Sequence, residues 1–302
     1  MRTKGAKNFV SFEKRTAVET SSSKEVRHLA NIKGSPLEEF RDLLKHQENF
    51  LDWVDRRHVV IVELKNEVRR LGKQSKGKGP TGAKEATFVK YRWYAEQLVL
   101  LEAINAFESF YKKTLVCLGT LLRDYVQPEA FRDIKIDAPL VWSTAGQISA
   151  PALMFEQSLF HDLEAVDKCL HMLVEDRRYN QNAPKSTVAD RVKALRAIFQ
   201  IRHTLSHNNG LVTEGDASKF KRLKFQIAVG EVIDPAKNYL GIAVFRILGA
   251  EANEITTWLA CATAAFLQKC ITNRGLAVPS AQRQDLESLL GVHPCWATIT
   301  WS

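Results

Sequence analysis

The stretch YAEQLVLLEAINAFESFYKKTLVCL, residues 94–118, decides the fold. Its apolar residues recur at spacings of three and four, which is the period of one face of an α-helix. The pattern predicts a long helix over residues 84–125 with one wide apolar face. The face consists of Tyr94, Leu98, Leu101, Ile104, Phe107, Tyr111, Leu115 and Leu118. A helix with such a face buries it in a core, so the block predicts a mostly α protein.

Helical periods also occur on both sides of this block. Upstream, Ser35-Pro36 is typical of an N-cap followed by a first-turn proline, and it predicts one long helix or two, ending near Leu71-Gly72. Downstream, further helices are expected over residues 154–179, 187–209 and 251–272. Residues 180–186 are expected to form a loop between two of them.

The period of the apolar residues changes after the helix expected over residues 187–209. Apolar residues alternate with polar or small ones at Leu223, Phe225, Ile227 and Val229. A period of two predicts a short strand that ends at Gly230. Residues 239–248 fit a strand or a helix, while residues 126–155 look irregular and residues 275–302 carry no clear pattern.

Composition divides the 302-residue chain into parts. Glycine (15) and proline (9) are scarce, which favours long helices. Polar, basic and serine-rich residues fill the first segment, which we expect to be poorly ordered, and KQSKGKGPTG, residues 73–82, reads as a flexible linker. The predicted parts are an N-terminal segment (1–35), a helical extension with its basic linker (36–83), a main helical domain (84–274) and a C-terminal tail (275–302).

Net charge and the absence of long apolar runs narrow the functional classes. Lys and Arg (43) outnumber Asp and Glu (34), and the net charge of +9 suits a polyanion such as nucleic acid or simply keeps the protein soluble. No apolar run reaches about 18 residues, so we expect no membrane span and no membrane partner. The basic N-terminus lacks the apolar core of a secretory signal. We therefore expect a cytoplasmic protein.

The cysteines are expected to be buried, reduced thiols. They lie among apolar neighbours and no pair has C-x-x-C spacing, so neither a zinc ribbon nor a thioredoxin-type motif is predicted. The residues concerned are Cys117, Cys169, Cys261, Cys270 and Cys295.

The candidate chemistry lies in RAIFQIRHTLSHNNG, residues 196–210, where Asn208-Asn209-Gly210 predicts a helix end. His203 and His207 are one turn apart, as in helical zinc sites, but Thr204 stands where such sites have a glutamate and no further ligands are evident. We therefore expect no metal. Histidine at a helix C-terminus also suits the helix dipole, so a purely structural role stays open.

A nuclease site is the third interpretation. Arg202 and His207 are five residues apart, so on a straight helix they point about 140° apart. Two such helices around a twofold axis could surround a phosphate with two arginines and two histidines. RNA cleavage needs a base for the 2′-OH, an acid for the leaving 5′-oxygen and a cation for the charged phosphorane. Histidine titrates near neutrality and arginine stays charged, which suits metal-free transesterification.

RHTLSH, residues 202–207, resembles the R-x4-H signature of HEPN domains, and Asn208-Asn209-Gly210 is similar to what often follows it there. LEAINAFESFYKK, residues 101–113, resembles an early HEPN helix, and the resemblance covers roughly residues 85–272. It implies an antiparallel helical bundle with a short β element after the motif helix, dimerised through the motif helices. It further implies a metal-independent endoribonuclease without cofactor, which leaves a 2′,3′-cyclic phosphate and occurs in toxin and antiphage defence systems.

The resemblance also implies roles for single residues. Arg202 would be the phosphate-binding cation and His207 the general acid and base, with His203 and Asn208 supporting them. Two glutamates on the partner helix could polarise a site residue or be plain exposed glutamates: Glu102 and Glu108. Basic side chains would bind the RNA backbone or form the solvent-exposed face of a strand: Lys219, Lys221, Arg222 and Lys224.

RNA, a second copy of the chain and a regulatory protein or antitoxin are the partners expected from this interpretation. Two alternatives stay open. The chain could be a non-catalytic HEPN-like module that binds a nucleotide, RNA or a partner protein. It could also be a structural helical protein in which the R-x4-H spacing is a coincidence.

Overall fold

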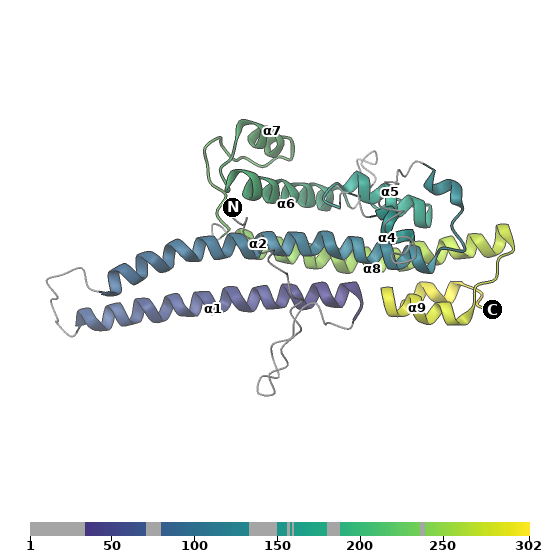
Figure 1. The fold of residues 1–302 in the computed structure, drawn as a ribbon, viewed down its shortest axis with the longest axis horizontal. Helices are drawn as coiled ribbons and strands as arrows, with labels where there is room; N and C mark the ends of the chain where they lie inside the picture. Colours follow the sequence, from purple (N-terminus) through teal and green to yellow (C-terminus); the bar gives the residue numbers. More distant parts are fainter. Residues whose placement is uncertain are drawn as a thin grey trace, which may run out of the picture. The chain divides into compact units, whose positions relative to one another are not determined.

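Long helices packed side by side form the core of the computed structural model (Figure 1). The structure describes residues 34–70, 80–132, 150–155, 158, 160–179, 188–235 and 239–302. Residues 34–302 make up one unit, and residues 1–33 belong to another. Residues 1–33 of the expected N-terminal segment, the 180–186 loop and most of the expected 73–82 linker therefore lie outside the described residues.

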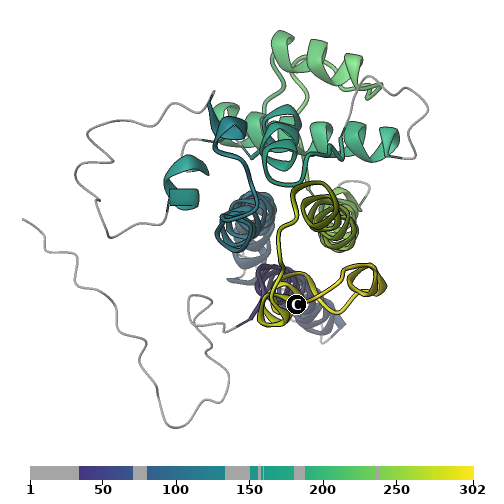
Figure 2. The same cartoon turned by 90° about the vertical axis from the view of Figure 1, so that its right-hand side faces the viewer.

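The helices of this unit lie in three layers (Figure 2). The middle layer holds α2 (Pro80–Leu121) and α8 (Leu240–Arg274). On one side lie α1 (Pro36–Arg70) and α9 (Ser280–Leu290). On the other side lie α5 (Leu163–Val174) and α6 (Ala189–Asn208). The prediction of a mostly α fold is confirmed.

Short elements lie between these helices or follow the last of them. They are η2 (Pro128–Phe131), α4 (Ala150–Phe155), α7 (Glu214–Arg222) and η4 (Pro294–Thr298). The C-terminal residues, which carry no clear pattern in the sequence, form α9 and η4, and Trp296 of η4 is completely buried. No described helix is long and apolar enough to cross a membrane.

The predicted apolar face of α2 is buried along most of its length. Ile104, Phe107, Tyr111, Leu115 and Leu118 are all buried in the core. At the N-terminal end of the face the prediction is wrong, because Tyr94 and Leu98 are exposed while Val99 and Leu100 are buried instead. One residue corresponds to about 100° of rotation, so the buried face is turned away from the predicted one there.

The predicted end of α6 is confirmed. The helix stops at Asn208, and Asn209 (φ 50°) and Gly210 (φ 81°) adopt left-handed conformations. The amide of Gly210 donates to the carbonyl of Thr204 at 3.0 Å, which satisfies a carbonyl at the helix end. A Cβ at Gly210 would lie 3.0 Å from Gln97 Nε2, so glycine also allows a close approach to α2.

One prediction of helix extent is corrected, and one ambiguous segment is assigned. The helix expected over residues 154–179 is divided into α4 and α5, because the Asp162 carboxylate accepts a hydrogen bond from Glu164 N at 2.9 Å and caps a new helix. The ambiguous residues 239–248 are helical from Leu240 onward, continuous with the rest of α8.

The predicted short strand is wrong. Within the described part of the chain no strand forms, and the one β contact near the motif helix is an isolated bridge between Leu211 and Val232. A capping box formed by Thr213 and Asp216 starts α7, which takes up residues 214–222. Phe225 and Val229 remain exposed, since no neighbouring strand pairs with their segment.

The cysteine prediction holds for part of the set. Cys169 and Cys270 are buried free thiols, but Cys117 is exposed. Cys261 and Cys295 form a disulfide, contrary to the expectation of reduced thiols. Sequence spacing could not show this pair, because only the packing of η4 on α8 brings the two residues together.

Candidate functional site

Arg202 lies on the side of α6 that faces α2. Its Nε donates to Asn105 Oδ1 at 2.8 Å and lies 3.2 Å from Glu108 Oε1. The Arg202 side chain keeps 28% of its surface exposed. Its two terminal nitrogens donate no hydrogen bond to the described residues, so they can donate to an anion.

Glu108 lies between two other ionisable groups. Its Oε1 faces Arg202, and its Oε2 lies 3.5 Å from His161 Nδ1. The buried Oε1 accepts no hydrogen bond among the described residues, so charge rather than hydrogen bonding joins it to Arg202. Arg202 is thus positioned through Nε by an amide and a carboxylate from the same face of α2.

A pocket of about 360 Å³ opens beside these residues. Arg202, His161 and Lys112 line it, together with Asn105 and Glu108. Two permanent cations and a histidine around an open cavity are suited to a phosphate group, because arginine and lysine both pair with phosphate oxygens.

His207 lies away from this pocket, in the last turn of α6. Its ring is exposed and lies 4.7 Å from the exposed His203 ring. Desolvation lowers the pKa of His203, and the charges of Lys219 and His207 lower it further. Lys219 of α7 therefore adds to a positive surface around both histidines.

Asp216 fixes the segment that follows His207. Asn208 Nδ2 donates to Asp216 Oδ2 at 2.9 Å, and Gln200 Nε2 donates to Asp216 Oδ1 at 2.8 Å. Thr213 adds its backbone amide and hydroxyl as donors to the same carboxylate. Burial alone would raise the pKa of Asp216, but the hydrogen bonds from Thr213 and Asn208 outweigh it and hold the pKa below its usual value. The end of α6 is therefore joined to the start of α7.

The remaining predicted site residues lie outside these two clusters. Glu102 is exposed and lies about 120° around α2 from Glu108, away from Arg202. Lys221 and Arg222 are exposed in the last turn of α7, and Lys224 is exposed in the turn that follows. These basic residues are therefore on a helix and a turn rather than on a strand.

Sequence reasoning missed several residues of the two clusters. Asn105 and Lys112 share a helical face with Glu108, at spacings of three and four, and this spacing could have indicated them. The Thr213-x-x-Asp216 capping box could have indicated Asp216. His161 lies in a turn without a periodic pattern, so no local signal indicates it.

A single chain does not join the two halves of the R-x4-H motif. Arg202 lines the pocket against α2, while His207 points to solvent at the helix end. His203 and His207 belong to no group of three metal ligands in the described part of the chain. Comparisons with models of protein families, with curated proteins and with solved structures found no match.

Proposed function

We propose that the protein is a metal-independent endoribonuclease of the HEPN type. The observation that carries this proposal is the state of Arg202, whose Nε is held by Asn105 and Glu108 at a polar pocket, while its terminal nitrogens donate no hydrogen bond to the described residues. Such a guanidinium is prepared to bind a phosphate and to stabilise the charge of a phosphorane, because it needs no reorganisation when the charge develops.

His207 supplies the proton transfers in this proposal. The 2′-oxygen loses its proton to one His207, bonds to phosphorus and displaces the 5′-oxygen, which takes a proton from a second His207. The products are a 2′,3′-cyclic phosphate and a 5′-hydroxyl. The exposed position of His207 at the end of α6 leaves its side chain accessible to a substrate.

Two copies of the chain are needed for this chemistry. Arg202 and His207 point about 140° apart on α6, so one helix cannot direct both at the same phosphate. A twofold pair of α6 helices brings Arg202 of one copy toward His207 of the other. Lys219, Lys221 and Lys224 extend the positive surface and support contacts to the RNA backbone.

The resemblance to HEPN proteins suggests the setting of this activity. We place it in the cytoplasm, in a toxin, antiphage defence or stress response role, under the control of a regulatory protein or antitoxin. The net charge of +9 supports a polyanionic substrate.

An RNA cleavage assay in EDTA tests the proposal. We expect cleavage by the wild type, with 2′,3′-cyclic phosphate ends, and a loss of at least about 10²-fold in Arg202→Ala and His207→Ala. Arg123→Ala and His171→Ala, at exposed positions elsewhere, are matched controls that should cleave normally. Cleavage that needs a divalent metal, or that survives both motif substitutions, would contradict the proposal.

The separation of His207 from the pocket favours a second candidate, a non-catalytic module that binds a nucleotide or RNA through its phosphate. Arg202 and Lys112 alone would then carry the function. In this case phosphate binding is lost in Arg202→Ala and unchanged in His207→Ala, and no RNA is cleaved.

A further inference from the structure

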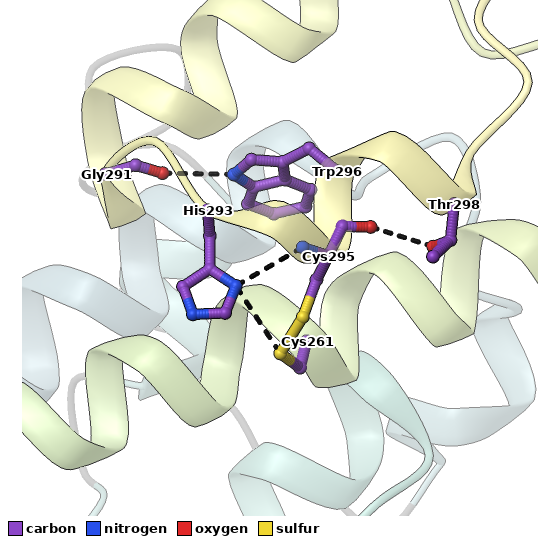
Figure 3. Close-up of a disulfide and its surroundings, with 6 residues drawn as sticks. All are labelled: Cys261, Gly291, His293, Cys295, Trp296 and Thr298. Carbon is purple, nitrogen blue, oxygen red and sulfur yellow. Dashed lines mark hydrogen bonds between the residues drawn. A yellow bond between two sulfur atoms is a disulfide. The ribbon is translucent and has the colours of Figure 1, made fainter.

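A cluster of sulfur and nitrogen ligands lies where the C-terminal η4 packs on α8 (Figure 3). It consists of Cys261 of α8, His293 just before η4 and Cys295 within it. One potential ligand atom from each residue lies within 4.8 Å of the others, and all three residues are half-buried. The Cα atoms of the two cysteines, here joined as a disulfide, are 5.2 Å apart.

The imidazole of His293 is oriented toward the two sulfur atoms. The backbone amide of Cys295 donates to His293 Nδ1 at 3.3 Å, and the same nitrogen lies 3.6 Å from Cys261 Sγ. Because Nδ1 accepts the amide proton, the ring proton is on Nε2. Nδ1 therefore has an unprotonated lone pair beside Cys261 Sγ, and in the disulfide state the Cys295 amide occupies it (Figure 3).

The surrounding turn holds these ligands in place. Trp296 is completely buried and donates from Nε1 to the carbonyl of Gly291 at 3.0 Å. Thr298 Oγ1 donates to the carbonyl of Cys295 at 2.8 Å. Pro294 restricts the backbone between the two ligands of the turn. The site is consequently positioned by packing and not by the disulfide alone.

We propose that Cys261, His293 and Cys295 bind a zinc ion once the two cysteines are reduced. Thiolate and imidazole are the ligands that zinc takes most often in proteins. In a tetrahedral site with Zn–S of about 2.3 Å and Zn–N of about 2.05 Å, sulfur and nitrogen lie about 3.6 Å apart. This edge length matches the separation of Cys261 Sγ and His293 Nδ1.

The two sulfur atoms separate when the metal enters. The same tetrahedron places them about 3.8 Å apart, which side-chain rotation allows over the existing Cα separation. The described residues offer three ligands, so a water molecule completes the fourth position. The disulfide is the oxidised, metal-free state of the same site.

The conversion between the two states is balanced by a thiol reductant. Two electrons and two protons from two reductant thiols convert the disulfide into two cysteine thiols, and the reductant becomes a disulfide. Each cysteine thiol then loses its proton as its sulfur binds Zn²⁺, and two protons pass to solvent. Both states join the C-terminal residues to α8.

Metal titration of the full chain tests the site. The protein is reduced with a phosphine, freed of metal and titrated with Co²⁺ and then Zn²⁺. We expect one equivalent of Co²⁺ with the visible bands of a tetrahedral thiolate site, displaced by Zn²⁺. The oxidised protein should show no such bands.

Substitutions locate the ligands. His293→Ala leaves the disulfide intact, so its oxidised form reports whether the chain still folds. Substituting a residue that only hydrogen-bonds to a metal ligand lowers metal affinity about 10–100-fold. Removing the ligand His293 itself should therefore weaken zinc binding at least about tenfold. Replacing both Cys261 and Cys295 by serine should remove the thiolate bands, while Cys117→Ser, at an exposed free cysteine, should retain them.

Three results would overturn the zinc site. The reduced wild type could take up no cobalt or zinc. His293→Ala could bind zinc as tightly as the wild type while folding normally. The thiolate bands could persist in the chain that lacks both Cys261 and Cys295, which would place the metal elsewhere.

Discussion

Glu108 is the residue that most directly positions Arg202 by charge. Replacing it by glutamine keeps the size of the side chain and removes the ion pairs with Arg202 and His161. A partly exposed pair contributes about 1 kcal/mol, so we expect Glu108→Gln to weaken RNA binding roughly fivefold. The measurement is KM for RNA together with the thermal unfolding midpoint.

Glu102→Gln is the matched control for this substitution, because Glu102 is exposed on the same helix and lies away from Arg202. An equal rise of KM in both variants would mean that Glu108 acts only through the overall charge of the protein.

Asp216 makes the end of the motif helix sensitive to acid. Hydrogen bonds in the folded state hold its pKa below the usual value of about 3.9. The stabilisation that Asp216 provides is therefore complete above this usual value. It is lost as pH falls through the lower pKa of the folded state. Asp216→Asn should lower the free energy of unfolding at pH 7 by about 1–3 kcal/mol, because buried donors lose a charged acceptor.

Urea unfolding at several pH values checks this prediction. The difference in the free energy of unfolding between wild type and Asp216→Asn should be constant from pH 7 to about pH 5 and should become smaller below about pH 4. A difference in the free energy of unfolding that stays the same down to pH 2 would show that the charge of Asp216 does not stabilise the fold.

Single residues of the site differ in how far the sequence predicts them. Arg202 and His207 could be selected because their spacing within one helix is local. Asp216 was predictable in principle from its capping box. His161 was not, since its position beside Glu108 depends on the packing of the α4–α5 connection against α2.

Among the elements, local end signals predicted structure better than apolar alternation did. Asn209 and Gly210 end α6 where expected, since their left-handed conformations are a property of the local sequence. The alternation from Leu223 to Val229 did not produce a strand, because a strand needs a partner and the described residues provide only an isolated bridge.

Gly119 allows α4 to pack closely on α2. A Cβ at this position would lie 3.1 Å from Pro151 Cβ and 3.4 Å from Phe155. A larger side chain must push α4 away, so we expect Gly119→Leu to lower the free energy of unfolding by about 1–3 kcal/mol. Denaturant unfolding measures this change.

Gly249→Ala provides the contrasting case in α8. A Cβ there would make only an ordinary contact of 3.6 Å with Leu44. Alanine should therefore stabilise the helix by up to about 1 kcal/mol. A Gly119→Leu variant as stable as the wild type would show that α4 does not need the close approach.

On the scale of the whole molecule, a buried polar network connects the middle layer with the layer of α5 and α6. Glu251 of α8 accepts from Tyr179 at 2.6 Å and from Arg178 at 2.7 Å, and Arg191 of α6 lies 3.5 Å away. Tyr179 also hydrogen-bonds Tyr111 of α2. Burial raises the pKa of both tyrosines well above the usual value, so they stay protonated and can donate.

Removing the central carboxylate should destabilise all three helices that meet there. Glu251 is fully buried, and Glu251→Ala leaves Arg178 and Arg191 with the half-exposed Glu254 as their remaining carboxylate partner among the described residues. We expect a loss of about 3–5 kcal/mol in the free energy of unfolding, measured in urea. Glu254→Ala, at a half-exposed position, should cost about 0–1 kcal/mol. Equal losses would contradict the assigned role of Glu251.

The layered arrangement itself was beyond sequence reasoning. Apolar periods predicted where helices form, but the choice of which faces meet depends on contacts between distant segments. The packing of α9 and η4 against α2 and α8 is an example, because residues 275–302 show no period that predicts it.

The measurement that tests the central claim most directly is RNA cleavage by an equal mixture of wild-type and His207→Ala chains, refolded together. A quarter of the dimers then keep both His207 side chains of the shared site, so activity should fall to about a quarter of that of the wild type. Activity of about half, as expected when each chain acts alone, would contradict a site shared between two copies.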